Sequence, residues 1–179
     1  LKAAIAFKNS KLGIPILVGK ESKIKEQIRN IGYNENFDIE IINSKDEDKR
    51  KKYLKHLFEK LQREQGLLER DCDRLLRNDR VIWATSMVAC GDADGAVTGN
   101  TRRFGASLEK IKQVVDVRDG EIMFGLNMVV HKGKTIFIGD TSVHEYPTSE
   151  ELAEIAISTA RVVRLFGFEP KVAFVSHST

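Results

Sequence analysis

Short apolar runs alternate with amphipathic segments of helical period along the chain, and this alternation limits the folds that it can adopt. Residues 14–18 are continuously apolar and end at Gly19, which is typical of a strand buried in a parallel sheet. Residues 21–31 then place three isoleucines on one helical face. Repeated strand–helix order of this kind predicts an α/β fold with three αβα layers, in which helices cover both faces of a mostly parallel sheet.

The same patterns predict the remaining elements. Further strands are expected over residues 37–43, 93–98, 122–130, 135–138 and 172–175. Further helices are expected over residues 1–11, around Leu57, around Leu75, and over residues 81–90, 101–116 and 148–167. Lys132-Gly133 separates two of the strands and predicts an antiparallel hairpin. Thr148 and Glu151 have the spacing of a capping box at the start of the last helix.

Composition excludes several classes of protein. The 179 residues carry 29 Lys and Arg against 26 Asp and Glu, and the basic excess lies mostly between Lys45 and Arg80, where acidic residues are interleaved. This pattern favours a solvated helix face over a nucleic-acid groove. No apolar run approaches 18 residues, so we expect no membrane span. Cys72 and Cys90 are too far apart for a C-x-x-C motif, which predicts reduced thiols, no structural zinc and a cytoplasmic location.

A first block of small and polar residues follows the predicted strand at 93–98. Gly99-Asn-Thr-Arg102 would offer free backbone amides, a hydroxyl and a guanidinium at a helix start, a combination that suits a phosphate or a carboxylate. The alternative is an ordinary helix cap followed by a solvent-facing arginine. Asp92 and Asp94, just before this block, could hold a metal or could form a turn.

A second block, Gly139-Asp-Thr-Ser-Val-His144, follows the predicted hairpin. Asp140 and His144 could orient each other as acid and base, with Thr141 as a donor beside them. The alternative is a turn in which Asp140 binds local amides and His144 helps to cap the next helix. Residues 176–179, Ser-His-Ser-Thr, form a hydroxyl-rich stretch after the last predicted strand, which is a good position for a ligand in an α/β sheet.

These blocks resemble the phosphate acetyltransferase (phosphotransacetylase) family. The resemblance runs over residues 13–19, 91–99, 139–156, 168–173 and 176–179 and so covers nearly the whole chain. It implies an α/β fold of the isocitrate/isopropylmalate dehydrogenase-like type, with a cleft between two subdomains and transfer of an acetyl group between coenzyme A and phosphate. On this basis residues 1–118 should form the first subdomain and residues 119–179 should begin the second.

Three departures make the chain more similar to the version of this domain fused at the C-terminal side of bacterial NADP-dependent malic enzymes. Asn78 precedes Asp79 where family enzymes carry an arginine, and Glu109 stands where they carry another. His144 ends the block that in the family enzymes ends in asparagine. The loss of two arginines removes charge-assisted contacts to phosphate. The resemblance also implies that three features of the family lie outside this chain: the first strand, the catalytic serine–arginine pair and the catalytic aspartate. The chain is therefore expected to be an incomplete domain without transferase activity.

The resemblance implies three alternative functions, which belong to different classes. The first is a regulatory domain that binds acetyl-CoA and reports it to a malic domain, where malate becomes pyruvate and CO₂. The second is a working phosphate acetyltransferase, in which the coenzyme A thiolate attacks acetyl phosphate. A third alternative is a domain that serves oligomerisation.

Ligands and site residues follow from the same resemblance. Acetyl-CoA, phosphate or acetyl phosphate is the expected ligand, in a homo-oligomer that binds neither nucleic acid nor membrane. No metal is expected in this chain, and NADP and a divalent metal would belong to the malic domain alone. The residues expected to line the ligand site are Gly99, Thr101, Arg102, Asp140, Thr141, His144, Ser178 and Thr179.

Overall fold

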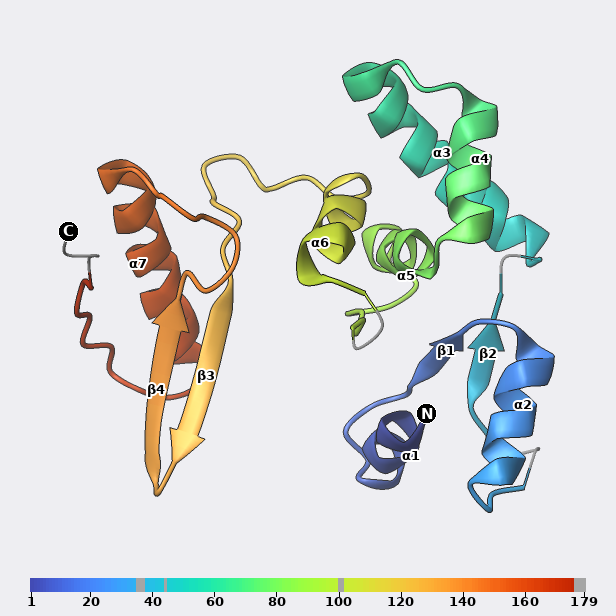
Figure 1. The fold of residues 1–179 in the computed structure, drawn as a ribbon, viewed down its shortest axis with the longest axis horizontal. Helices are drawn as coiled ribbons and strands as arrows, with labels where there is room; N and C mark the ends of the chain where they lie inside the picture. The colour runs from blue at the N-terminus through green and yellow to red at the C-terminus, as the bar shows by residue number, and fades with distance from the viewer. Residues whose placement is uncertain (35–37, 44, 100–101, 176–179) are drawn as a thin grey trace. The chain divides into compact units, whose positions relative to one another are not determined.

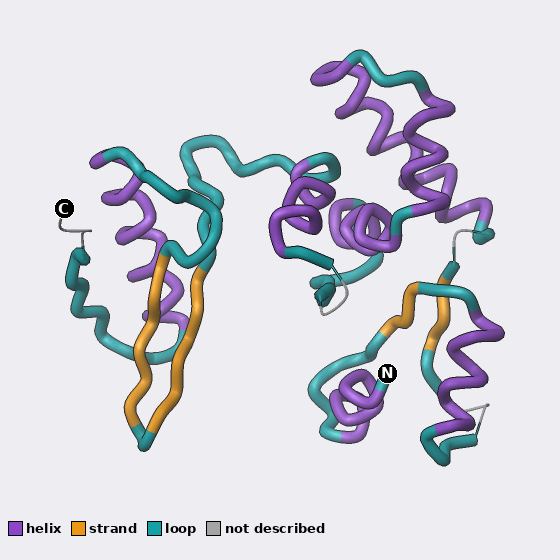
Figure 2. Tube along the Cα trace, viewed as in Figure 1, coloured by secondary structure: helices purple, strands orange, loops and turns teal. Residues whose placement is uncertain are grey.

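A computed structural model describes residues 1–34, 38–43, 45–99 and 102–175 of the chain. The chain divides into two compact units, Leu1–Asp116 and Val117–Thr179, which we call the N-terminal and the C-terminal unit. Each unit has its own secondary structure and its own packing, shown in Figures 1 and 2.

The N-terminal unit contains two short parallel strands and six helices within its described residues. The strands are β1 (Ile16–Val18) and β2 (Glu40–Ile42), which pair in the register Ile16 to Glu40. The helices are α1 (Lys2–Asn9), α2 (Glu21–Asn30), α3 (Glu47–Gln65), α4 (Glu69–Asn78), α5 (Arg80–Ala89) and α6 (Phe104–Lys112). Helix α2 connects the two parallel strands, as the sequence predicted (Figure 1).

The long helix α3 supplies most of the core of this unit. Tyr53, Leu57 and Leu61 recur every four residues, so they share one face of the helix, and each is fully buried. They pack with side chains of α4 and α5, namely Cys72, Leu76, Ile82, Trp83 and Met87. The Tyr53 and Trp83 rings meet edge to face, with centroids 5.2 Å apart and planes at 82°.

Both ends of α3 carry the signals that a helix of this length needs. The Asp46 carboxylate accepts a hydrogen bond from the Lys49 amide at 3.0 Å and caps the first turn. Gly66 closes the last turn in the left-handed conformation, which glycine adopts without a steric penalty. Near that end Lys60 is buried and pairs with Asp116, which fastens the segment after α6 to α3.

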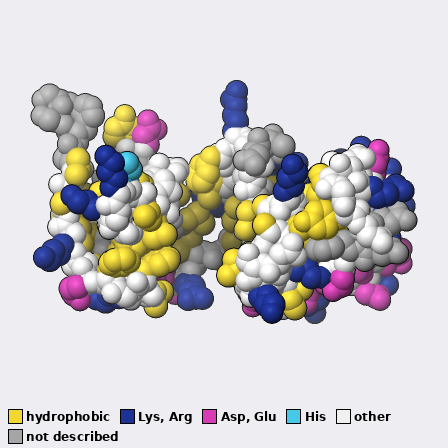
Figure 3. Space-filling model, turned by 90° about the horizontal axis from the view of Figure 1, so that it is seen from below, with side chains coloured by type: hydrophobic (Ala, Val, Ile, Leu, Met, Phe, Trp, Pro, Cys, Tyr) yellow, Lys and Arg dark blue, Asp and Glu magenta, His cyan; other side chains and the backbone are white. Residues whose placement is uncertain are grey.

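The C-terminal unit is an antiparallel hairpin with a helix packed along it. Strands β3 (Leu126–His131) and β4 (Lys134–Gly139) pair from Leu126–Gly139 to His131–Lys134, and helix α7 (Ser149–Leu165) packs against β4. Lys132 and Gly133 both have positive φ, as a two-residue turn between twisted strands requires, so the predicted hairpin is confirmed. Apolar side chains remain exposed on this unit, and Figure 3 shows several of them gathered on one face.

Comparison with the sequence-based expectations gives confirmations and corrections. The α/β class, the parallel strands and the hairpin are confirmed, although the strands of the described residues lie in two separate two-stranded sheets. The strands expected over 93–98 and 172–175 are wrong, because both segments are irregular and no described strand pairs with them. Val97 is fully exposed and Val175 is nearly so, and an unpaired apolar run of this kind has no partner for its backbone groups.

The capping box of α7 gives a direct test of this fold. The Thr148 hydroxyl accepts from the Glu151 amide at 3.2 Å, while the Glu151 carboxylate accepts from the Thr148 amide at 2.8 Å. Thr148→Ala should lower the free energy of unfolding by about 1 kcal/mol, the usual effect of losing an N-cap side chain. Ser149→Ala, one residue on, is the matched control and should leave the thermal midpoint unchanged. Equal midpoints for the two variants would show that the cap does not stabilise α7.

Candidate functional site

The loop that follows β4 is organised around the buried carboxylate of Asp140. Only 3% of this side chain is exposed, although the loop itself lies at the surface. Oxygen Oδ1 accepts hydrogen bonds from the amides of Gly125, Ser142 and Val143, at 2.8, 3.0 and 3.2 Å. Oxygen Oδ2 accepts from the His144 amide and lies 2.8 Å from Nδ1 of the same residue. The carboxylate therefore joins the start of β3 to the whole loop from 140 to 144.

These hydrogen bonds fix the charge state of Asp140. Burial by itself raises the pKa of a carboxyl group, because it removes water from the ionised form. The amides of Ser142 and Gly125 and the side chain of His144 outweigh burial, so the pKa of Asp140 lies far below its ordinary value. The group stays ionised at neutral pH, and its oxygens are engaged within the loop.

Both sequence-based interpretations of this loop describe part of what is observed. Asp140 and His144 do orient each other, and Asp140 also binds local amides. Asp140 contacts Nδ1 of His144, so the second ring nitrogen is not engaged by this carboxylate. In the same loop the hydroxyls of Ser142 and Thr141 lie 3.3 Å apart, and the ionised Asp140 orients the loop through its amides.

Close packing explains the glycines around the loop. A Cβ at Gly125 would lie 3.0 Å from Asp140 Oδ1 and from Thr141 Oγ1, so a larger residue would push the carboxylate away from the amide that it binds. A Cβ at Gly139 would lie 2.7 Å from Thr159 Oγ1 on α7, which real side chains do not tolerate. Both positions hold the loop against its neighbours.

In the N-terminal unit, the Arg102 side chain binds Asp79. A guanidinium nitrogen lies 2.6 Å from Asp79 Oδ2, while Asp79 Oδ1 caps α5 by accepting from the Val81 amide at 2.8 Å. Burial raises the pKa of Asp79, but Arg102 and the helix amides outweigh it and hold that pKa below its usual value. Arg102 remains 42% exposed, so donors that do not contact Asp79 stay accessible.

Asp92 binds two side chains of helix α3 and so holds the segment after α5 against that helix. Its two carboxylate oxygens accept from the Tyr53 hydroxyl at 2.7 Å and from Lys52 Nζ at 2.5 Å, which hold the pKa of Asp92 below its ordinary value. No group of three or more potential metal ligands occurs among the residues that the structure describes. Within the same residues, no helix is long and apolar enough to cross a membrane.

The remaining predicted residues can be placed only in part. Gly99 is exposed and has φ of 150°, a conformation that favours glycine. Thr101, Ser178 and Thr179 lie outside the described residues. Within the C-terminal unit, Asp140, Thr141 and His144 are brought together in one loop, as their spacing indicated.

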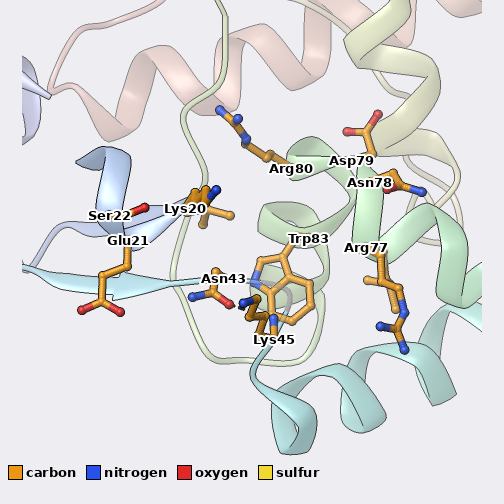
Figure 4. A pocket seen from close by; sticks show the side chains of 13 residues that line it. Lys20, Glu21, Ser22, Asn43, Lys45, Arg77, Asn78, Asp79, Arg80 and Trp83 are labelled. Atoms are coloured by element: carbon orange, nitrogen blue, oxygen red, sulfur yellow. Dashed lines mark hydrogen bonds between the residues drawn. The ribbon is translucent and has the colours of Figure 1, made fainter. Parts of the chain in front are cut away.

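Sequence reasoning missed a pocket in the N-terminal unit. It has a volume of about 520 Å³ and opens where β1 and β2 end, next to the first turns of α2 and α5 (Figure 4). Its polar lining includes Lys20, Asn43, Lys45, Arg80 and the indole of Trp83. The available signal was Lys20 at a helix start directly after a buried strand, where α/β proteins often bind ligands.

Comparison with known proteins decides the family. A family model described as "Phosphate acetyl/butaryl transferase" matches residues 1–179, which is the entire chain. The chain belongs to this family. It is a phosphotransacetylase-like domain, in agreement with the resemblance seen in its sequence.

Relatives of two kinds are found. The chain is 38% identical over 180 residues to an NADP-dependent malic enzyme of Rhizobium meliloti, covering 100% of this chain and 24% of the relative. It is 31% identical over 166 residues to a phosphate acetyltransferase of Helicobacter pylori, covering 92% of this chain and 31% of that protein. The chain therefore spans about a quarter of the length of the malic enzyme and about a third of the transferase.

A solved structure supports the fold. A phosphotransacetylase from Streptococcus pyogenes superposes with a TM-score of 0.85 at 26% identity, covering 99% of this chain and 54% of the other. The phosphotransacetylase-like fold expected from the sequence is therefore confirmed.

The depressed pKa of Asp140 predicts how acid affects stability. A carboxyl whose pKa is lower in the folded than in the unfolded chain stabilises the fold above its unfolded pKa of about 4, and this stabilisation is lost as pH falls further. Asp140→Asn should therefore lower the free energy of unfolding at pH 7 by about 1.5–3 kcal/mol, the range for charge-assisted hydrogen bonds. The difference in free energy of unfolding between this variant and the unmodified chain should become smaller between pH 5 and pH 3, and denaturant unfolding measures it.

Asp119→Asn is the matched control for this experiment. Asp119 is an exposed carboxylate of the same unit, so its replacement should change stability little at any pH. The free energies of unfolding of the Asp140 variant and the unmodified chain are compared at pH 7 and pH 3. If they differ by the same amount at both, Asp140 is not an ionised, hydrogen-bonded group.

Proposed function

We propose that this phosphotransacetylase-like domain binds acetyl-CoA and acts as a regulatory sensor for a malic enzyme domain. The observation that carries the proposal is the loss of positive charge at two positions. Where the resemblance expects anion-binding arginines, the chain carries Asn78, which is exposed, and Glu109, which pairs with Lys112 at 3.6 Å. Binding can persist with fewer cations, whereas acetyl transfer depends on stabilising the negative charge that develops on the acetyl oxygen and the departing phosphate in the transition state.

The relatives support the same role. Malic enzymes of five bacteria are 33–38% identical to the chain, with coverage of 93–100% of its length. A sensor of this kind needs a ligand site and a coupling free energy to a second site, and no chemistry of its own. In the C-terminal unit we assign Thr141 and His144 to contact with phosphate or thioester oxygens, and Asp140 to their orientation. In the N-terminal unit we assign Arg102 to contact with a phosphate.

Ligand binding and acetyl transfer are separable by experiment. Calorimetry with the 179-residue chain should show saturable binding of acetyl-CoA, and an assay with coenzyme A and acetyl phosphate should show no acetyl-CoA formation above a boiled control. In the full-length gene product, acetyl-CoA should change the rate of malate oxidation. Turnover by the chain would instead establish the second candidate, a phosphate acetyltransferase, which the similarity to the Helicobacter pylori enzyme favours.

Arg102 provides the mutational test of the binding site. Arg102→Ala should weaken acetyl-CoA binding by about 1.5–3 kcal/mol, because it removes a charge-assisted hydrogen bond. Folding stability should change by less than about 1 kcal/mol, since the ion pair with Asp79 is partly exposed and Asp79 keeps its cap bonds to α5. Arg103→Ala, the exposed neighbour, is the control; equal affinities of the two variants would remove Arg102 from the site.

Self-association and a cytoplasmic location are further parts of this proposal. Both rest on the family resemblance, and location also on Cys72 and Cys90, which are free thiols. Coenzyme A is the ligand proposed for this chain, while NADP and a divalent metal are assigned to the malic domain. If sedimentation shows a monomer at micromolar concentrations, the self-association part fails while the sensor role can still be tested.

A further inference from the structure

A buried hydroxyl on α7 lies against the end of the strand that leads into Asp140. The Thr159 Oγ1 atom is shielded from solvent and has no hydrogen-bond partner among the residues that the structure describes. A Cβ placed on Gly139 would lie only 2.7 Å from this oxygen. Gly139 is the last residue of β4, and α7 packs along that strand (Figure 1). The hydroxyl therefore lies close to the backbone directly before the Asp140 loop.

A threonine at this place needs a physical reason. In a helix a threonine hydroxyl can bond the carbonyl one turn earlier, and a buried hydroxyl without any such bond destabilises the fold. Valine would replace the hydroxyl with a methyl group and leave no donor unpaired. A methyl group is larger than a hydroxyl oxygen, however, and two carbon atoms pack best at about 3.5–4.0 Å. The oxygen at the γ position therefore lets Gly139 approach α7 more closely than a methyl group would.

The other neighbours of Gly139 leave ordinary space. The same Cβ would lie 3.5 Å from Leu126 Cδ1 and 3.6 Å from Phe124 Cδ2, which are normal van der Waals distances. The φ of Gly139 is not positive, so a residue with a Cβ could adopt it. The need for glycine at the end of β4 therefore comes from the Thr159 oxygen.

Helix α7 holds the Asp140 loop at both of its ends. At the end of the loop, the capping box of Thr148 and Glu151 starts the helix. At the beginning of the loop, the third turn of the same helix meets Gly139 through Thr159. Asp140 is the next residue, so any shift of Gly139 moves its carboxylate relative to the Gly125 amide, which it binds at 2.8 Å.

We propose that Thr159 is a positioning residue for the Asp140 loop. Its γ oxygen sets how closely the end of β4 approaches α7, and this distance places the Asp140 carboxylate on its amide donors. Where the inference concerns acetyl-CoA it rests on the proposed function, because the contact of this loop with that ligand is itself proposed. The geometric part is tested without any ligand, so the two can fail separately.

A double-mutant cycle tests the contact itself. Gly139→Ala should lower the thermal midpoint, because the new Cβ meets the Thr159 oxygen. Thr159→Ala removes that oxygen, so in the double variant most of the loss caused by Gly139→Ala should disappear. A double variant that folds where Gly139→Ala alone does not gives the same answer. If the two losses add, the oxygen does not limit the approach of β4 and the proposal is wrong.

The pH dependence of unfolding separates positioning from a purely structural role. Thr159→Val puts a methyl group in place of the oxygen, so Gly139 should move away from α7 and Asp140 should lose part of its hydrogen bonding. The pKa of Asp140 in the folded chain then rises towards its unfolded value. The variant should therefore lose less stability between pH 5 and pH 3 than the unmodified chain does. Thr159→Ser keeps the oxygen and should keep the original pH dependence.

Thr135→Val is the matched control for this measurement. Thr135 is a half-buried threonine of β4 near the hairpin turn, where the same exchange should leave the pH dependence unchanged. If Thr159→Val lowers stability by the same amount at pH 7 and at pH 3, Thr159 has a packing role only and the proposal is overturned.

Calorimetry with acetyl-CoA connects Thr159 to the ligand site. Thr159→Val should bind acetyl-CoA about tenfold more weakly than the unmodified chain, as after the loss of one charge-assisted hydrogen bond, whereas Thr159→Ser should bind equally well. Unchanged affinity of the valine variant would contradict a role in ligand binding. If the unmodified chain binds no acetyl-CoA, the sensor proposal fails, and the cycle and the pH dependence still decide whether Thr159 positions the loop.

Discussion

The contact between Tyr53 and Trp83 is the point on which the N-terminal unit depends. Both rings are fully buried and meet edge to face. They lie on helices α3 and α5, whose nearest ends, Gln65 and Arg80, are 15 residues apart in the sequence. The hydroxyl of Tyr53 holds Asp92 and with it the segment after α5, while the indole of Trp83 forms one wall of the pocket. One aromatic pair thus links the core to the segment after α5 and to the pocket, and replacement of either ring should disturb both.

The C-terminal unit uses a buried charge for the same purpose. Asp140 is shielded from water and is stabilised by amides from its own loop and from Gly125, which lies 15 residues earlier. A buried carboxylate is tolerable only where hydrogen bonds replace its hydration, and here they also bring His144 and Thr141 to one place. The loop can therefore present a fixed set of donors.

Local signals in the sequence predicted the features that local physics controls. The capping box at Thr148 and the Lys132-Gly133 turn each depend on residues within four positions of one another, and both are observed. The pairing of Asp140 with His144 was foreseen for the same reason.

Features that depend on distant partners could not be predicted in this way. The strand expected over residues 93–98 fails because an apolar run becomes a strand only beside another strand, and no described strand pairs with this segment. The bond from Gly125 to Asp140, the pairing of Arg102 with Asp79 and the pocket around Trp83 each join segments that no short pattern connects. The apolar helix expected over residues 81–90 includes Trp83, but its pattern carried no information about the partners of the indole nitrogen.

Hydrogen–deuterium exchange with and without acetyl-CoA tests the proposal that this domain binds acetyl-CoA, for which the Asp140 loop of the C-terminal unit and the Arg102 segment of the N-terminal unit are each proposed as contacts. Peptides that cover residues 139–148 and 99–104 should exchange more slowly with the ligand, while peptides from the core of α3 should not change. Acetyl-CoA that binds by calorimetry yet protects neither segment would contradict the account, because the ligand would then occupy a different part of the chain.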